Sequence, residues 1–321
     1  MDGLFRWGRS LRFKRLDLNL LMALDAMLAE RSVTAAARRL FLSQSATSGA
    51  LARLREHFHD ELLVSVGRRM ILTPFAQSIV EPVRRLMLQI ETTVGSGARF
   101  DPETATRKFT ISASDYVTEV LLAGLVVEVA TSAPGVILEF VPSLENPAGP
   151  LEAGDIDLLI TPDIFASPGH PSELLFEDEH VVVGWSGNPR LDEPLSADTF
   201  FELGHVVVRF ARARAPTFAD MQIAKLPGQR RIETIAASFT SVPRMVVGTH
   251  RIAVMHRRLA EMYAKNLPLA VHVLPFDFPP LREMIQSHSV RAPDEGLGWL
   301  KQLLHRQAAM IDPPMGEIHS S

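Results

Sequence analysis

Residues 33–58, VTAAARRLFLSQSATSGALARLREHF, constrain the fold of this chain more than any other stretch. Small alanines, a short turn at Phe41-Leu42 and a following run of hydroxyl and amide side chains predict two short helices around a tight turn. In a helix-turn-helix, the second helix of such a pair enters the major groove of DNA. The pattern therefore predicts a DNA-binding head.

Three residues suited to helix caps precede the helices of this head: Asp17, Ser32 and Ser43. The first helix is predicted to run to about Glu30. Helical spacing predicts that its buried face carries Leu18, Leu21, Met22 and Leu28.

A hairpin and a long helix are predicted next. Leu62–Val66 and Met70–Thr73 flank Gly67 as the two strands of a wing. From Pro74 to about Gly95 an amphipathic helix follows, with Pro82 inside it. Its apolar stripe either docks on its own domain or pairs with a second copy, and we favour the second copy. The stripe consists of Phe75, Ile79, Val83, Leu86 and Ile90.

Charge separates this head from the rest of the 321-residue chain, which is long enough for two or three domains. Residues 1–72 hold 12 Lys and Arg against 7 Asp and Glu, whereas the remaining 249 residues hold 21 against 30. We expect that only the N-terminal part meets phosphate. The chain has no cysteine, which excludes disulfides and thiolate chemistry.

After a linker at residues 95–107, strands alternate with helices, which predicts an α/β region. No nucleophile-elbow, phosphate-loop, dinucleotide or zinc-protease motif occurs, so we predict neither an enzyme nor a metal site. No apolar run approaches the ~20 residues of a membrane span. The first fifteen residues are basic without the apolar centre of a signal peptide, and we expect a cytoplasmic protein with no membrane partner.

The candidate DNA contacts combine short polar side chains with arginines. A glutamine can bond adenine through two hydrogen bonds, a threonine methyl can contact thymine, and arginines suit phosphates. The alternative is that the hydroxyls are only helix caps and the arginines a solvated face. The candidates are Thr34, Ser43, Gln44, Ser45, Thr47, Ser48, Arg53, Arg68 and Arg69.

Several short motifs resemble the LysR-type transcriptional regulators: residues 17–21 (DLNLL), 34–37 (TAAA), 42–46 (LSQSA), 53–55 (RLR) and 72–74 (LTP). The opening RFKRLDLNLL and the later SDYV resemble the nodulation-regulator branch, which includes regulators that respond to plant flavonoids and to other phenolic compounds. Two positions depart from the family pattern: Ser45 stands where proline is common, and Gly49 where arginine or another large residue is common.

This resemblance implies an N-terminal winged helix-turn-helix, a long linker helix and a C-terminal bilobed α/β effector-binding domain of the periplasmic-binding-protein type. The expected boundaries are 15–73 for the winged helix, 74–106 for the linker and dimerisation helix, 107–165 completed by 268–310 for the first subdomain, and 166–267 for the second. The resemblance also implies a ligand cleft between the two subdomains.

Polar contacts in such a cleft come from strand ends and helix starts. We expect hydroxyl, imidazole, guanidinium and aromatic groups to form a pocket for a phenol. Caps, ordinary core residues, or a bridge between Asp115 and Arg209 would account for the same residues without a ligand. The candidates are Ser114, Asp115, Tyr116, Thr161, His205, Arg209, Phe210 and Ser241.

The expected function is that of a transcription activator controlled by a small aromatic inducer, such as a phenol, chlorophenol or flavonoid-like compound, with no cofactor. Its expected partners are double-stranded promoter DNA, RNA polymerase, a second copy through the linker helix, and a homotetramer. Two alternatives stay open: a ligand-independent repressor or architectural protein whose C-terminal lobes only oligomerise, and a solute-binding module with a vestigial DNA head.

Overall fold

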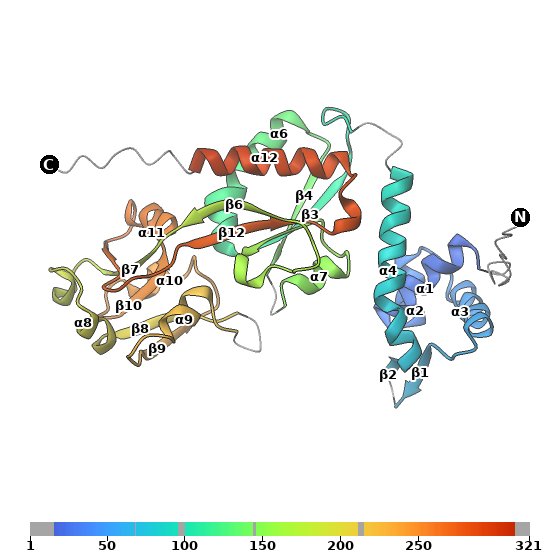
Figure 1. Ribbon diagram of the computed structural model, residues 1–321, viewed down its shortest axis with the longest axis horizontal. Coiled ribbons are helices and arrows are strands. Elements are labelled where there is room, and N and C mark those ends of the chain that lie inside the picture. Colours follow the sequence, from blue (N-terminus) through green and yellow to red (C-terminus); the bar gives the residue numbers. More distant parts are fainter. Residues whose placement is uncertain (1–15, 68, 96–99, 144–145, 211–214, 312–321) are drawn as a thin grey trace, which may run out of the picture. The chain divides into compact units, whose positions relative to one another are not determined.

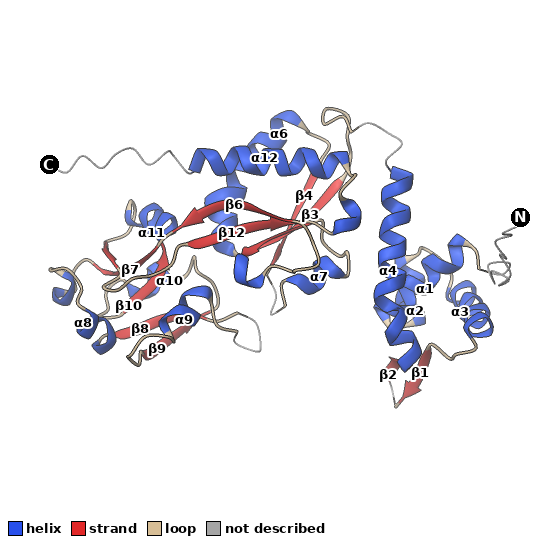
Figure 2. Cartoon of the chain, viewed as in Figure 1, coloured by secondary structure: helices blue, strands red, loops and turns tan. Residues whose placement is uncertain are grey.

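The computed structural model describes residues 16–67, 69–95, 100–143, 146–210 and 215–311 (Figure 1). The chain divides into two compact units, residues 1–95 and 96–321. The first is mainly helical, and the second combines helices with two five-stranded sheets (Figure 2).

Side-chain caps begin the first three helices as predicted. The oxygens of Asp17, Ser32 and Ser43 each accept a hydrogen bond from a backbone N–H three residues further on, at 2.9, 3.2 and 3.1 Å. These bonds satisfy N–H groups that a first helical turn leaves without partners. The helices are α1 (Leu18–Glu30), α2 (Val33–Arg39) and α3 (Gln44–Phe58).

The predicted wing and long helix are also present. Strands β1 (Leu63–Val66) and β2 (Arg69–Leu72) form an antiparallel hairpin, and Gly67 adopts a φ of 62° in its turn. Thr73 caps the next helix by accepting a hydrogen bond from the Ala76 N–H at 3.0 Å. That helix is α4 (Pro74–Gly95), with Pro82 inside it.

The buried face of α1 agrees with the predicted one only in part: Leu28 is buried and Leu21 packs against the same core, as predicted. Leu20, Leu24 and Met27 are each 3% exposed or less, whereas Leu18 and Met22 are 47% and 43% exposed. Because α1 is apolar almost all the way round, periodicity alone does not distinguish the face that packs on α3 and α4.

Helix α4 uses most of its apolar stripe within its own unit. Val83 is buried, and Ile79 and Ile90 pack against the same core. An ion pair of 2.8 Å between Arg84 and Asp25 joins α4 to α1. Phe75 and Leu86 are exposed, as is Val94 beyond the predicted stripe, so part of the helix still presents an apolar surface.

The first sheet of the 96–321 unit has the order β4-β3-β5-β12-β6. Strand β3 is parallel to its neighbours β4 and β5, and β12 runs antiparallel to both its neighbours. The strands are β3 (Lys108–Ala113), β4 (Ile137–Pro142), β5 (Leu158–Pro162), β6 (Ser172–Asp178) and β12 (Leu281–Gln286).

The second sheet has the order β11-β7-β10-β8-β9. Strand β7 is antiparallel to β10 and β11, while β8 is parallel to β10 and β9. The strands are β7 (His180–Trp185), β8 (Gly204–Val208), β9 (Arg231–Ala236), β10 (Ile252–His256) and β11 (Leu269–Val273).

The chain passes between the sheets at different places from those expected. Strand β6 lies in the first sheet and β11 in the second, so the crossings fall at residues 178–180 and 273–281 instead of near 162–168 and 268. Prolines suggested the expected positions, but strand pairing decides which sheet a segment joins, and pairing partners are distant in sequence.

Helices cover both sheets, and α12 runs beside α6 over the first one (Figure 1). Helix α9 was not predicted, although Thr217 and Asp220 form a capping box at its start. The helices are α5 (Asp115–Val117), a π-helical turn (Thr118–Leu122), α6 (Ala123–Ser132), α7 (Ala148–Glu152), α8 (Ala197–Glu202), α9 (Phe218–Ile223), α10 (Val242–Val246), α11 (Arg257–Ala264) and α12 (Glu295–Ile311).

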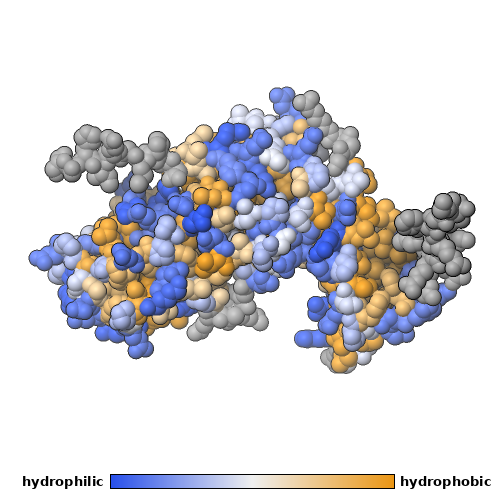
Figure 3. Space-filling view, in the orientation of Figure 1, coloured by the Kyte–Doolittle hydropathy of each residue, from blue (hydrophilic) through white to orange (hydrophobic). Residues whose placement is uncertain are grey.

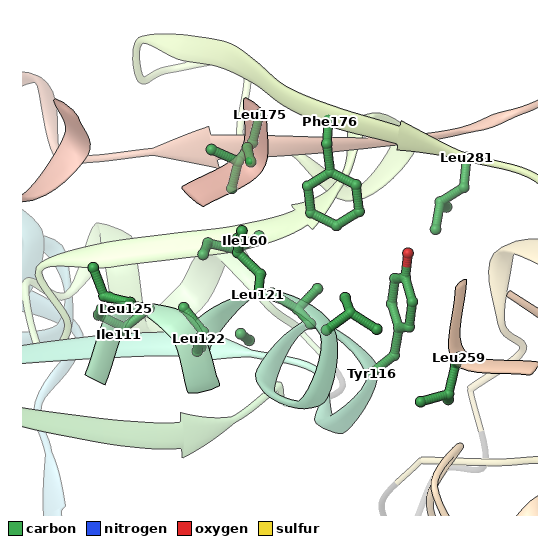
Figure 4. Packing of buried hydrophobic residues seen from close by; sticks show 14 of the residues in the cluster. Ile111, Tyr116, Leu121, Leu122, Leu125, Ile160, Leu175, Phe176, Leu259 and Leu281 are labelled. Atoms are coloured by element: carbon green, nitrogen blue, oxygen red, sulfur yellow. The ribbon is translucent and has the colours of Figure 1, made fainter. Parts of the chain in front are cut away.

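One buried cluster extends through both lobes of this unit. Figure 4 shows part of it, where the Tyr116 hydroxyl points between Phe176 and Leu281 of the first lobe, with Leu259 of α11 from the second lobe near the ring. The two lobes therefore share a continuous apolar core. The architecture confirms the expected fold class, an N-terminal winged helix-turn-helix followed by a bilobed α/β domain.

Candidate functional site

The start of α3 presents a polar face. Ser43, Gln44, Ser45 and Ser48 are exposed. The Ser43 and Ser45 hydroxyls lie 3.0 Å apart, and Ser43 also caps the helix. An amide and several hydroxyls on the first turns of a recognition helix match the donors and acceptors that base edges require.

Thr47 is a correction to the predicted DNA contacts. Its side chain is fully buried, and its hydroxyl donates to the Ser43 carbonyl at 3.1 Å. Position 47 lies on the inner face of α3 together with Leu51 and Leu54, so neither its methyl group nor its hydroxyl is available to a base.

Two of the predicted arginines are exposed on this unit. Arg53 makes an ion pair of 3.4 Å with Asp17, in which both side chains are more than half exposed. Arg69 is exposed at the start of β2, Thr34 is exposed on α2, and Arg68 lies outside the described residues. An exposed ion pair contributes little to stability, so Arg53 can exchange Asp17 for a phosphate at low cost.

Arg55 was not predicted to have a role, and it joins the wing to α3. Its guanidinium donates to the backbone carbonyls of Glu61 and Leu63, at 2.8 Å each, and pairs with the Glu61 carboxylate at 3.1 Å. The segment that enters β1 is therefore bound directly to the recognition helix.

The 96–321 unit contains a cavity between its two sheets, with about 790 Å³ of space not filled by protein atoms, counting its opening. Four phenylalanines line it, and hydroxyl groups add hydrogen-bonding capacity. The phenylalanines are Phe165, Phe210, Phe218 and Phe239, and the hydroxyls belong to Ser114, Ser143, Thr161 and Thr217.

Three buried titratable side chains also line this cavity: Glu283 of β12, His180 of β7 and His256 of β10. They are 2%, 7% and 4% exposed. Within the described ranges, Glu283 Oε2 and the Nδ1 atoms of both histidines have no hydrogen-bond partner. Buried polar atoms are nearly always paired, so three unpaired atoms at one cavity mark a place where a ligand can bond.

Burial controls the protonation of these groups. It raises the pKa of Glu283 to about 8, and the nearby carboxylates of Asp178 and Asp163 add to the rise. It lowers the pKa of His180 to about 3. Burial, then the neighbouring His180, holds the pKa of His256 well below 6.5. All three groups are therefore uncharged at neutral pH.

Ser114, Thr161 and Phe210, three of the predicted ligand residues, lie in the wall of this cavity. They come from the end of β3, the end of β5 and the segment after β8, which are the kinds of position that the sequence argument selected. Ser114 also caps α5 by accepting a hydrogen bond from the Val117 N–H at 3.2 Å.

Asp115 and Tyr116 do not line the cavity and are corrected. Asp115 accepts hydrogen bonds from the Thr240 N–H and hydroxyl, so the suggested bridge to Arg209 is absent from these described residues. Tyr116 is fully buried, donates to Asp178 at 2.6 Å, and stacks on His256 with ring centroids 3.7 Å apart. Burial, then Asp178, raises the pKa of this phenol well above 10.

His205 is also corrected, because its side chain is buried within the second lobe. Its Nε2 lies 2.7 Å from the Phe200 carbonyl, and burial lowers its pKa to about 4. The backbone carbonyl thus pairs Nε2, while Nδ1 has no partner among the described residues, and this imidazole is not in the cavity wall.

Arg209 and Ser241 are corrected for a similar reason, since each has a partner away from the cavity. Arg209 forms an ion pair with Asp220, which also binds Arg230 at 2.5 Å. The Ser241 hydroxyl donates to the Ser238 carbonyl at 2.9 Å and caps no helix. Among the described residues that line the cavity there is no lysine or arginine.

Sequence reasoning missed Glu283, His180 and His256. A signal was present for Glu283, because a single carboxylate stands within the strand LREMIQ, where burial would leave it uncharged. Across the described ranges, no cluster of three histidine or acidic side chains is arranged to hold a metal ion. Nor does any helix in the described parts have both the length and the apolar character needed to cross a membrane.

Comparison with known proteins agrees with this architecture. The bacterial regulatory helix-turn-helix family of LysR type matches residues 18–77, and the LysR substrate-binding domain matches residues 102–309. Nodulation protein D 2 of Rhizobium tropici is 40% identical over 97% of this chain and 99% of its own length. Nodulation protein D 1 of Rhizobium meliloti is 40% identical over 94% of this chain and 98% of its own length.

Solved structures show the same fold. A probable transcriptional regulator from Pseudomonas aeruginosa superposes with a TM-score of 0.61 at 29% identity, covering 91% of this chain and 97% of that one. Full-length OxyR from the same organism, as a single-residue variant, has a TM-score of 0.72 at 14% identity, covering 92% and 95%. With both family regions matched in order over most of its length, the chain belongs to the LysR family of DNA-binding transcriptional regulators.

Proposed function

We propose that this regulator activates transcription from a promoter in response to a small aromatic compound that binds between the two lobes of residues 96–321. The observation that carries the proposal is the cavity, which combines phenylalanine walls with hydroxyl groups and unpaired buried polar atoms. Aromatic surface favours a planar apolar ring, and the polar atoms favour hydroxyl or carbonyl substituents. Similarity to the Nodulation protein D relatives supports a phenolic or flavonoid-like inducer.

The ligand acts by preferring one arrangement of the two lobes. It shifts the equilibrium between arrangements only by its difference in affinity for them. The shift alters how the regulator holds promoter DNA, and RNA polymerase is the partner that responds.

The proposed assembly is a homodimer through α4 and a homotetramer through the effector units. Leu18 and Met22 of α1 are exposed, as are Leu86 and Val94 of α4. Figure 3 shows apolar surface over the part of the molecule that α1 and α4 occupy. Paired recognition helices would then contact two half-sites on one duplex. The proposed location is the cytoplasm, where the DNA is.

Titration calorimetry of the full-length protein with a panel of hydroxylated aromatic compounds tests the proposal, together with gel-shift assays on the promoter of the neighbouring gene. We expect at least one compound to bind one site per chain and to change the mobility or footprint of the protein–DNA complex. DNA binding without a response to any aromatic compound would instead favour a ligand-independent DNA-binding protein.

A further inference from the structure

The cavity wall is made entirely of groups that are uncharged at neutral pH, as far as the described residues go. Its one acidic side chain, Glu283, is 2% exposed and lines the cavity together with two neutral imidazoles, those of His180 and His256. Arg209, the cation that the sequence suggested for the ligand, is bound to Asp220. An anion that entered this cavity would lose its hydration and meet no opposite charge among these residues.

The unpaired atoms define what a ligand must supply. A carboxylic acid at Glu283 offers one O–H donor, and the Nδ1 atom of a neutral histidine is a donor or an acceptor depending on its tautomer. Leaving such atoms unpaired costs free energy that a ligand with matching groups recovers. A carbonyl or hydroxyl oxygen matches the acid of Glu283, whereas a carboxylate would face it with its own charge unpaired.

We propose that Glu283, as a neutral carboxylic acid, donates a hydrogen bond to the ligand and, with His180 and His256, makes the cavity selective for uncharged aromatic ligands over anionic ones. This inference rests on the proposed function of the cavity and names the charge class of its ligand. Glu283 is the specificity-determining residue, and the two histidines are its uncharged counterparts on the second sheet.

Selectivity of this kind depends on pH through Glu283. The titratable groups around it are Asp178 on β6, Asp163 after β5, Tyr116 on α5, and His180 and His256 on β7 and β10. Tyr116 holds its proton well above pH 10 and the histidines stay neutral, so between about pH 7 and about pH 9 Glu283 is the group expected to change charge.

A matched pair of two-ring probes tests the proposal on the full-length protein: 4-carbamoylchalcone, which is uncharged at every pH used, and 4-carboxychalcone, its anionic isostere. Calorimetry near pH 7 is expected to show that the carboxamide binds at least about tenfold more tightly, since the carboxylate would lose its hydration and meet no opposite charge among the described lining residues. Equal or tighter binding of the carboxylate would overturn the inference and leave the aromatic ligand site standing. If neither probe binds, both this inference and the proposed aromatic ligand site are wrong.

Variants of Glu283 separate a ligand contact from a structural role. The affinity of the wild-type protein for the carboxamide should fall roughly tenfold between about pH 7 and about pH 9, because the binding-competent acid becomes the minor form. Glu283→Gln keeps a donor and should bind with no such pH dependence, whereas Glu283→Leu should bind about tenfold more weakly at pH 7.

Glu177→Gln is the matched control, because Glu177 is an exposed carboxylate on the neighbouring strand β6, paired with Arg282 outside the cavity. It should keep the wild-type affinity and pH profile. A wild-type profile as flat as that of Glu283→Gln would show that Glu283 does not contact the ligand, and melting temperatures of all four proteins verify that each is folded.

Discussion

Asp115 and Thr240 join the two lobes of the effector-binding unit. The Asp115 carboxylate accepts hydrogen bonds from both the N–H and the hydroxyl of Thr240, at 2.8 Å each. Asp115 begins α5 on the first lobe, and Thr240 lies two residues before the start of α10 on the second. A relative movement of the lobes at this edge of the cavity must therefore break or stretch this pair.

Asp115→Ala should destabilise the effector-binding unit by about 1–3 kcal/mol, because it leaves a half-buried N–H and hydroxyl without their acceptor. Urea unfolding followed by tryptophan fluorescence measures the loss. Thr240→Val removes the hydroxyl bond and keeps the backbone bond, so it should lose less. An unchanged unfolding midpoint in both variants would show that the pair does not hold the lobes together.

Gly49→Ala should stabilise the N-terminal unit by about 1 kcal/mol, since glycine is that much poorer than alanine inside a helix. No atom lies within 4 Å of the position that a Cβ would take at Gly49. Gly124 on α6 is the matched control, because a Cβ there would meet Gln307 Oε1 at 2.4 Å and force that side chain to move. Calorimetry should give a rise in the melting temperature for Gly49→Ala and a smaller one, or none, for Gly124→Ala.

Gln44→Ala should cost roughly 1–3 kcal/mol of binding free energy on the true operator and little on random DNA, if its amide bonds a base edge.

Arg69→Ala should instead weaken binding to all DNA sequences alike and reduce the slope of log affinity against log salt concentration by about one unit, as expected for a phosphate contact. Fluorescence anisotropy with both duplexes at several salt concentrations distinguishes the two. Equal losses on both duplexes for Gln44→Ala would refute base readout by this side chain.

The free energy of unfolding of the effector-binding unit should decrease as the pH rises, because of Glu283. Its folded pKa of about 8 lies above the ordinary value of 4.5, so between these values the folded chain binds one proton more than the unfolded chain. Stability from this group is full below pH 4.5 and falls as the pH rises toward 8. The melting temperature of Glu283→Gln should therefore exceed that of the wild type by a margin that widens from about pH 6 to about pH 8.

His180 should instead lower the free energy of unfolding as the pH falls. Its folded pKa of about 3 lies below the ordinary 6.5, so stability is full above pH 6.5 and is lost as the pH falls toward 3. In His180→Gln this acid-side slope should be smaller while the alkaline slope of Glu283 persists. Parallel melting curves of wild type and both variants across this range would contradict the assigned protonation states.

The sequence predicted those features of the fold that depend on contacts between residues close together in the chain. Asp17, Ser32 and Ser43 cap helices because a cap bonds an N–H three residues away, and this requirement is visible in the sequence. The wing and α4 follow from similar short-range rules. The prediction for the buried face of α1 was wrong at Leu18 and Met22, because these residues are as apolar as those that are buried.

The candidate cavity was predictable only in part, because partners distant in sequence decide which side chains remain available. Arg209 is bound by Asp220 and His205 by the Phe200 carbonyl, and neither contact follows from a local pattern. Ser114, Thr161 and Phe210 stand at strand ends, where the argument from topology holds. Glu283 belongs to β12, which lies in the first sheet but follows all the strands of the second sheet in the sequence. Its neighbours in the first sheet are therefore distant in sequence.

The bond between Arg55 and the entry to β1 has a geometric consequence for operator choice. With its guanidinium on the carbonyls of Glu61 and Leu63, the wing keeps a constant distance from the start of α3. A duplex that contacts both must present neighbouring grooves at that separation. If the wing and the start of α3 both contact DNA, as proposed, the groove width and the local bending of the duplex affect affinity. Base pairs beyond those proposed for Gln44 then contribute through the shape of the DNA.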